Sequence, residues 1–295
     1  MSSITHPHPE QHARMPFGLF FISTSVQVAL VLGLYALVAG QTLAAEASNV
    51  PLLVAWVVAL GVPLSLFEYL YHRYLLHSAV LPFLGIMHHC HAEHHGLTSV
   101  KAPVLSKEPE RMVPVASEYP VEHEHQEASM MFPYFAASIF YAIFVGMAAI
   151  PLKLLIPSQP LVLAMIVTVT LYYAGYEVWH AILHLPYERF WGPLVQSRWL
   201  GGLTRYVYSF HLVHHCRPSS NLAVVGLWGV AVWDHVFATH KRPKHLPLDG
   251  ASINYQDISL PKPRWPISVL DRLQGPFYKA SRNIERTLSQ AFRKR

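Results

Sequence analysis

Residues 51–77 read PLLVAWVVALGVPLSLFEYLYHRYLLH and join an apolar run directly to a pair of histidines. The run from Pro51 to Tyr71 is long enough, at about 1.5 Å per helical residue, to cross a hydrocarbon layer of about 30 Å. It leads into a more polar segment that carries His72 and His77. This stretch therefore predicts a membrane-spanning helix whose end presents histidines at the membrane surface.

Three further apolar runs accompany this one: Pro16–Gly40, Met130–Ile150 and Leu161–Tyr176. The first exceeds the roughly 7–15 residues of a signal-peptide core. Charged residues make up only 13% of the chain, against about 25% in soluble domains, and the mean hydropathy is +0.27. We therefore expect an all-α, multi-pass integral membrane bundle with about four transmembrane helices.

The charges between these runs predict an orientation. Residues 41–49 contain no Lys or Arg, whereas Lys101, Lys107 and Arg111 follow the second run. Residues 240–295 hold twelve basic and four acidic residues. Cytoplasmic loops are enriched in Lys and Arg, so both termini and the histidine-bearing segments are expected on the cytoplasmic face, as an even number of crossings allows.

The remaining segments complete the expected organisation. Residues 1–14 are expected to be a disordered tail, 15–240 one transmembrane domain, and 241–295 a basic cytoplasmic tail. From Ile267 onward, apolar residues alternate with Arg and Lys, which suits an amphipathic helix on an anionic membrane surface. Residues 221–237 are apolar but broken by two glycines, and we expect a buried or interfacial helix there. The sequence shows no soluble basic domain with base-stacking aromatics, so no nucleic-acid partner is expected.

Histidine is the unusual residue in this composition, because the chain has 20 of them and ten form four clusters. The clusters are His72 and His77; His91, His94 and His95; His180 and His184; and His211, His214 and His215. Helical positions i, i+3 and i+4 lie within about a third of the circumference. Each triplet, and the pair His180 and His184, is therefore expected to aim its imidazoles at one point. Five residues rotate a helix by about 140°, so the first pair must reach different metals unless its helix bends.

Ten imidazoles are too many for one ion and predict two metal ions with about five ligands each. Imidazole suits iron, zinc, copper and nickel, whereas a structural zinc site is closed with four ligands. We therefore expect two iron ions, for which zinc can substitute in purified material. Cys90 and Cys216 each lie beside a histidine pair and leave a thiolate ligand open as an alternative. Two cysteines alone form no disulfide framework and fit a reducing compartment.

Acidic residues near the clusters are expected to orient the ligands, since a metal-bound histidine usually donates its second ring N–H to a carboxylate or carbonyl. Three acids are favoured for this role: Glu68, Glu177 and Asp234. For Glu93, a role in orienting a ligand and a charge that is simply exposed to water at a helix end are equally compatible with the sequence. His88 and His89 are rival ligands to the second cluster, and His123 and His125 stay without an assigned role.

At these residues the sequence resembles the fatty acid hydroxylase superfamily, which includes sterol C-4 methyl oxidases, sterol desaturases and sphingolipid fatty-acid 2-hydroxylases. The resemblance covers roughly residues 55–240 and is carried by EYLYHRYLLH (68–77), HAEHH (91–95), WHAILH (179–184), FHLVHH (210–215) and NLAVVGLWGVAVWDHVFATH (221–240). The additional histidine pair shortly before the last triplet, His180 and His184, separates this family from the acyl-chain desaturases. The short stretch RMVP at 111–114 resembles the acyl-chain 2-hydroxylases.

The resemblance implies that 15–240 is a fatty acid hydroxylase-like domain with a cytoplasmic, histidine-rich di-metal cap. It also implies O₂ as co-substrate and hydroxylation of an unactivated C–H bond in a membrane lipid. The chain carries no fused cytochrome b5 domain, so a separate ferredoxin or cytochrome b5-like donor is expected, and a bacterial inner membrane is favoured over the endoplasmic reticulum. The alternatives are a lipid desaturase or sterol-type oxidase on the same metals, a histidine-rich metal transporter, and a metal-stabilised scaffold.

Overall fold

The computed structural model describes residues 17–82, 84–98, 129, 131–185, 187–242 and 258–293. Within these ranges the chain forms helices and connecting loops, and no strand beyond one isolated bridge between Leu227 and Val230. The expectations for residues 1–14, for the basic segment around Lys101, and for His123 and His125 fall outside the described residues.

Four helices are long and apolar enough to cross a membrane, which confirms the predicted number of spans. They are α1 (Phe17–Ser48); α2 (Val50–Tyr71), which continues into η1 (His72–Leu76); α5 (Ala136–Phe140), which continues through η2 (Tyr141–Ala149) into α6 (Ile150–Leu155); and α7 (Leu161–Leu183). Their outer surfaces stay apolar and exposed, with Leu37 84% and Leu154 78% accessible. An apolar surface of this extent suits contact with lipid.

We expected residues 41–49 to form a loop between the first two spans, but they are helical as far as Ser48. The range of α1 consists of two helical segments that meet at a kink at Ala39, where φ is −145° and ψ is 48°. The segment from Leu43 onward is rich in alanine, the strongest helix former. Glu46 is also buried there, 2.7 Å from the Lys153 ammonium, and accepts a hydrogen bond from the Leu163 backbone N–H. These contacts attach the helical segment after the kink to α6 and α7.

The spanning helices pack around a buried apolar core contributed mainly by α7 and its neighbours. Phe20 of α1 lies against Tyr173, with ring centroids 5.4 Å apart. The Tyr172 hydroxyl lies 2.9 Å from the carbonyl oxygens of both Gly61 and Gly226. That single side chain therefore joins α7 to α2 and to the loop beside the histidines.

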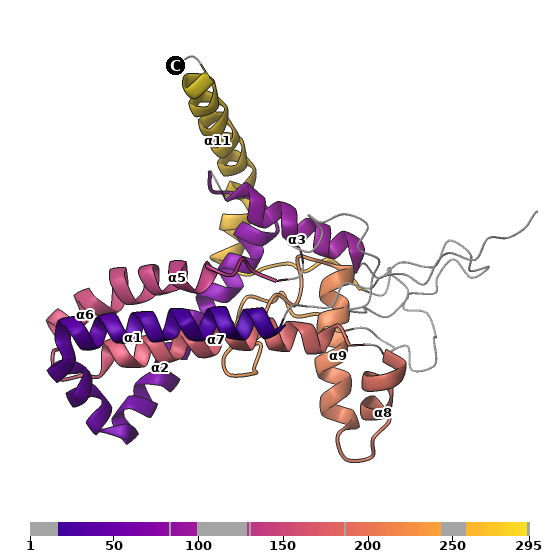
Figure 1. Cartoon of the computed structure of the whole chain (residues 1–295). Coiled ribbons are helices and arrows are strands. Elements are labelled where there is room, and N and C mark those ends of the chain that lie inside the picture. The colour runs from indigo at the N-terminus through magenta and orange to yellow at the C-terminus, as the bar shows by residue number, and fades with distance from the viewer. Residues whose placement is uncertain are drawn as a thin grey trace, which may run out of the picture.

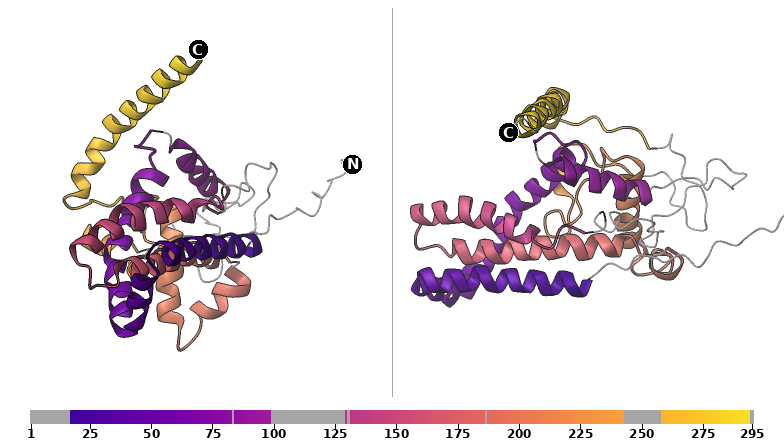
Figure 2. Two further views of the ribbon diagram at one scale, coloured as in Figure 1. Left: turned by 60° about the vertical axis from the view of Figure 1, so that its left-hand side comes forward. Right: turned by 45° about the horizontal axis from the view of Figure 1, so that its top comes forward.

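The remaining helices gather mostly at one end of the spanning bundle, as Figures 1 and 2 show. They are α3 (Gly85–Leu97), η3 (Tyr187–Trp191), α8 (Gly192–Val195), α9 (Gly201–Cys216), α10 (Val232–Val236) and α11 (Ile267–Arg293). The helices α3 and α9 carry the two histidine triplets. We call α3 and α9 the cap helices.

The helix predicted for residues 221–237 is wrong except for its last turn, α10. The backbone reaches positive φ at Asn221 (53°), Gly226 (59°) and Gly229 (94°), which an α-helix excludes. A side chain at Gly226 is also excluded, since a Cβ would lie 2.5 Å from the Val230 carbonyl oxygen. The apolar residues before α10 therefore form an irregular loop instead, which is buried at residues 221–224 and exposed at residues 228–230.

Candidate metal centre

The first histidine pair is brought together by a local widening of the α2 helix. In η1, the N–H of His77 donates to the carbonyl of His72, five residues earlier, at 3.2 Å. Such a π-type turn places residue i+5 near residue i, whereas an α-helix would separate them by about 140°. The two rings stack with centroids 5.0 Å apart. Both histidines can therefore reach one metal ion. The expectation that they serve different metals held only for a straight α-helix and does not apply to this turn.

The ten histidines form two neighbouring groups of ligand atoms, and each triplet contributes to both of them. The expectation that a triplet aims all its imidazoles at one point is therefore wrong. On α3, His91 and His95 lie in one group and His94 in the other. The reason is the helical period: positions i and i+4 differ by about 40°, whereas adjacent positions differ by about 100°. Adjacent histidines therefore point in different directions, and each His-His pair contributes to both groups.

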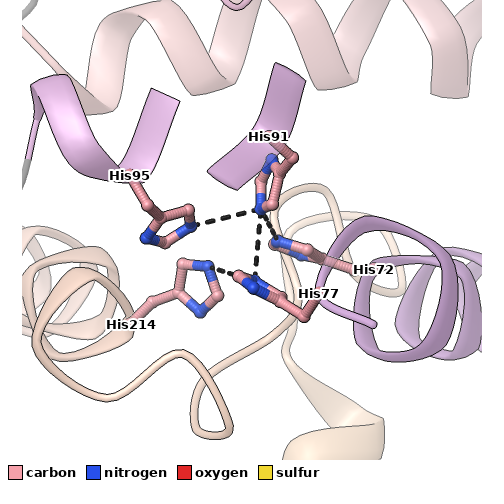
Figure 3. Close-up of side chains that lie close together, drawn as sticks. All are labelled: His72, His77, His91, His95 and His214. Atoms are coloured by element: carbon pink, nitrogen blue, oxygen red, sulfur yellow. Dashed lines mark hydrogen bonds between the residues drawn. The ribbon is translucent and has the colours of Figure 1, made fainter. Parts of the chain in front are cut away.

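Two groups result, and in each of them the ligand atoms lie within 4.8 Å of one another. The first histidine group, drawn in Figure 3, comprises His72, His77, His91, His95 and His214. The second histidine group comprises His94, His180, His184 and His215. His211 contacts the second group, with its Nε2 2.9 Å from that of His184 and 3.1 Å from that of His215. The structure thus brings together all ten histidines that the spacing singled out.

The two groups adjoin and are built alike. Each takes one pair from the end of a spanning helix, an i and i+4 pair from one cap helix, and a single histidine from the other cap helix. The single members are His214 in the first group and His94 in the second. Across the boundary, the rings of His95 and His215 stack with centroids 4.3 Å apart. Because α3 and α9 both contribute to both groups, neither helix can move away from one group without disturbing the other.

The spacing of the ring nitrogens fits metal coordination. Neighbouring Nε2 atoms lie 2.9 to 3.4 Å apart. With metal–nitrogen bonds of about 2.1 Å, cis ligands of an octahedral ion lie about 3.0 Å apart and trans ligands about 4.2 Å. The Nε2 of His91 lies within 3.2 Å of three other Nε2 atoms. One ring nitrogen carries at most one proton, so a central cation satisfies these contacts better than hydrogen bonds do.

The second ring nitrogen of several histidines is held by the protein. The Nδ1 of His72 lies 2.6 Å from the Leu222 carbonyl, and that of His214 lies 2.9 Å from the Ser220 carbonyl. The Nδ1 of His215 lies 3.2 Å from the Thr98 hydroxyl, which itself donates to the His94 carbonyl. These acceptors place the proton on Nδ1 and leave Nε2 bare toward the group. Sequence reasoning missed all three, because backbone carbonyls and a lone threonine carry no recognisable pattern.

The three acids reach the histidines only indirectly. Glu68 accepts the backbone N–H groups of Val224, Val225 and Gly226 at 2.6, 2.8 and 2.9 Å. Asp234 accepts those of Leu222 and Ala223 at 2.9 and 3.0 Å, and the Thr239 hydroxyl at 2.7 Å. These two carboxylates therefore hold the loop whose Leu222 carbonyl orients His72.

Glu177 lies on α7 and has a different partner. Its carboxylate accepts the Phe132 backbone N–H at 2.9 Å. The residue is buried, as is His180 one turn later on the same helix. Its hydrogen bond fixes the start of the third span beside the site.

Comparison with protein-family models, with curated proteins and with solved structures gave no match.

The rival ligands lie outside both groups. The Nδ1 of His88 lies 2.8 Å from the Leu76 carbonyl, and His89 is exposed on the outer side of α3. Glu93 is half-buried on the same helix and belongs to neither group. Cys216 is buried, and desolvation raises the pKa of its thiol to about 12. Among the described residues, neither it nor Cys90 joins a group, so the thiolate alternative has no support.

Burial keeps the imidazoles neutral, the form in which they bind metals. Desolvation lowers the pKa of His94 to about 3 and that of His214 to about 4. Desolvation, reinforced by the neighbouring histidines, also lowers the pKa values of five more: His77, His91, His95, His211 and His215. Each group can therefore hold a metal ion without first releasing protons at neutral pH.

This burial predicts acid sensitivity of the metal-free protein. Between the ordinary histidine pKa of 6.5 and the folded value of about 3 for His94, the unfolded chain binds a proton that the folded chain does not. The free energy of unfolding should therefore fall as the pH drops below 6.5, by about 1.4 kcal/mol per pH unit for each such histidine. Thermal unfolding in micelles between pH 7.5 and 5 measures this.

A His94→Leu variant should lose stability less steeply over that range, because it removes one protonation site. His89→Ala, at an exposed position, should leave the slope unchanged. Equal slopes for the wild type and His94→Leu would contradict the assignment of a neutral buried imidazole.

Proposed function

We propose that this protein is an integral-membrane, non-haem di-iron oxygenase that hydroxylates an unactivated C–H bond of a membrane lipid with O₂. One observation carries the proposal: ten imidazoles converge into two adjoining groups where the spanning helices meet the cap. Iron is favoured because the first group already offers five nitrogen donors, more than a closed structural zinc site uses. Bound iron would supply the activation of O₂ and the oxidising power for C–H cleavage.

The side chains of this protein would hold the metal ions in position and exclude water from the site. His72, His94, His184 and His214 are at most 1% exposed. The Leu222 and Ser220 carbonyls fix the ring orientation of His72 and His214. Exclusion of water from such a site prevents side reactions of reactive oxygen species. These features suit an oxidation catalyst better than a metal-stabilised scaffold, which needs no more than a closed site.

An apolar pocket beside the metal centre supports a hydrocarbon substrate. It is a partly open depression between α2, α5, η2 and α7, with a cavity volume of about 60 Å³. Its walls are mostly aromatic: Phe67, Tyr71, Phe132, Phe140, Phe144, Tyr172, Tyr173 and Tyr176. The Tyr176 ring lies 5.7 Å from that of His180 and 6.5 Å from that of His72, centroid to centroid. A lipid chain lying in this pocket, within the spanning helices, would bring a C–H bond toward both groups past Tyr176.

The charge distribution supports a cytoplasmic position for the metal centre. A separate electron donor, either a ferredoxin or a cytochrome b5-like protein, would then reach it from that side. We favour a bacterial inner membrane over the endoplasmic reticulum for this chain.

The decisive test is comparative lipid mass spectrometry on cells with and without the intact gene, with a His214→Ala variant as control. Hydroxylation predicts a lipid that gains one oxygen atom only with the intact protein. Loss of two hydrogen atoms would instead identify a desaturase on the same metals. An unchanged lipid profile, in cells shown to contain iron-loaded protein, would overturn the proposal in favour of transport or a scaffold.

The pocket makes a separate prediction about chain selectivity. Val169 lines the pocket from α7, and Val169→Phe should reduce kcat/KM for long chains at least about tenfold, since a few methylenes in an apolar pocket decide discrimination of this size. Activity on shorter chains should fall less. Competition assays with acyl chains of different length measure this preference.

Leu171→Phe is the matched control, because Leu171 lies on the same helix but is 48% exposed on the outer surface. Phe144→Ala, which enlarges the pocket, should shift the preference in the opposite direction. Unchanged chain preference in both pocket variants, with normal metal content, would exclude this pocket as the substrate site.

A further inference from the structure

The last helix, α11, carries an apolar stripe that stays partly exposed along the whole helix. The stripe consists of Leu270, Leu273, Phe277, Ile284 and Leu288. At about 100° per residue these positions fall within about 60° of the circumference. Their side chains are between 36% and 55% exposed. A soluble helix end would not keep so regular an apolar face in water.

The opposite face of α11 is basic. Arg272, Lys279, Arg282 and Arg286 lie roughly 120–200° around the helix from Leu270. The two acids of the helix each pair with an arginine: Asp271 with Arg73 of η1 at 2.7 Å, and Glu285 with Arg282 of this basic face at 2.9 Å. An apolar stripe opposite a basic face is the pattern of a helix that lies in the interface of an anionic membrane.

The root of α11 is attached where the second span ends. Ile267 is fully buried in a cluster with Tyr69 and Leu222. Asp271 accepts hydrogen bonds from Arg73 at 2.7 and 2.8 Å and from the Tyr74 hydroxyl at 2.9 Å. Arg73 and Tyr74 belong to η1, the last turn of the span Val50–Leu76. The helix therefore begins at the boundary of the membrane-spanning region.

From that root, α11 projects crosswise to the spanning helices, as Figures 1 and 2 show from different directions. A helix with this direction runs along the bilayer plane when the other helices cross it. The apolar phase nearest to the stripe is then the bilayer itself.

We infer that α11 is an interfacial anchor that binds the surface of an anionic bilayer lengthwise. Its apolar stripe lies at the boundary between headgroups and acyl chains, and its basic face lies toward the aqueous side and is attracted by anionic headgroups. The Asp271–Arg73 ion pair couples this anchor to the turn that carries His72 and His77, and so sets the depth of the first histidine group relative to the bilayer. This inference does not depend on which reaction the metal centre performs.

Fluorescence quenching of the full-length protein in nanodiscs tests the anchor. An environment-sensitive thiol dye is attached in a Cys90→Ser background, either to Leu273→Cys or Ile284→Cys on the stripe or to Lys279→Cys on the opposite face. Cys216 stays unlabelled because it is buried and its thiol pKa is raised to about 12. Iodide should quench the stripe labels at least about threefold less than the Lys279→Cys label, since an interfacial face is buried roughly 5–10 Å deep.

Nanodiscs of phosphatidylcholine alone, compared with nanodiscs that also contain phosphatidylserine, separate the apolar and the electrostatic contributions to the binding of α11 to the bilayer. Stronger protection with phosphatidylserine at low salt supports the anionic preference, whereas equal protection in both compositions overturns it. Equal quenching of stripe and basic-face labels would overturn the anchor itself. Protection that occurs only in nanodiscs with two copies of the chain would also overturn it, by identifying the stripe as a self-association surface.

Discussion

Replacing His94 with alanine is expected to lower lipid turnover more than a hundredfold and to remove metal from the second histidine group, while membrane insertion stays intact. The loss of a residue that merely orients a ligand costs about 10–100-fold in metal affinity or activity, and His94 lies within the group itself. Its side chain is 1% exposed, and neither ring nitrogen has a hydrogen-bond partner among the described residues. Its ring lies 4.8 Å from those of both His180 and His184, centroid to centroid.

The matched control is His89→Ala, the same substitution on the same helix at an exposed position. It should retain full metal content and turnover, measured as metal per chain and as oxidised lipid per chain. The reciprocal variant, His214→Ala, should empty the first group instead, because His214 is the single ligand that α9 sends there. Near-normal turnover in His94→Ala with full metal content would contradict both the site and the proposed chemistry.

Replacing Glu68 with glutamine is expected to lower the free energy of unfolding by about 1–3 kcal/mol, because at least one buried backbone N–H group would lose its acceptor. The carboxylate accepts three backbone N–H groups of residues 224–226. A glutamine amide places an NH₂ group against at least one of these donors. The loop should loosen, and metal affinity of the first group should fall as the Leu222 carbonyl releases His72.

Glu177→Gln is the matched control for this variant. Glu177 is also a buried carboxylate on a spanning helix, but within the part of the chain that the structure describes it accepts only one backbone hydrogen bond, from Phe132. Chemical unfolding in micelles and metal titration should show a clearly smaller loss than in Glu68→Gln. An equal loss in the two variants would mean that general burial of charge, rather than the loop contacts, decides stability.

The membrane-spanning part of the fold could be predicted because it depends on a local property. A run of apolar residues long enough to cross a bilayer has few alternatives to a helix, and all four runs form one. The boundaries were less predictable. The helical segment that follows the kink at Ala39 is held by an ion pair between Glu46 and Lys153, which lie more than a hundred residues apart in the sequence. No local pattern carries that information.

The loop at 221–231 failed as a predicted helix for a similar reason. Its apolar composition matches a buried helix, but its backbone N–H groups are satisfied by Glu68 and Asp234 instead of by the next turn. A carboxylate 156 residues away in sequence thus replaces the helical hydrogen bond. The glycines at positive φ were the only local sign of this outcome.

The sequence by itself determined the spanning helices and the ten histidines of the site, because hydrophobic length and helical spacing are properties of short segments. Only the tertiary structure decided how the histidines divide. It places His94 and His95 in different groups, closes the His72–His77 turn in the π form, and supplies the Leu222 and Ser220 carbonyls. The physical reason is that each group is assembled from the end of a spanning helix and two cap helices. Their convergence depends on packing between segments that are distant in the chain.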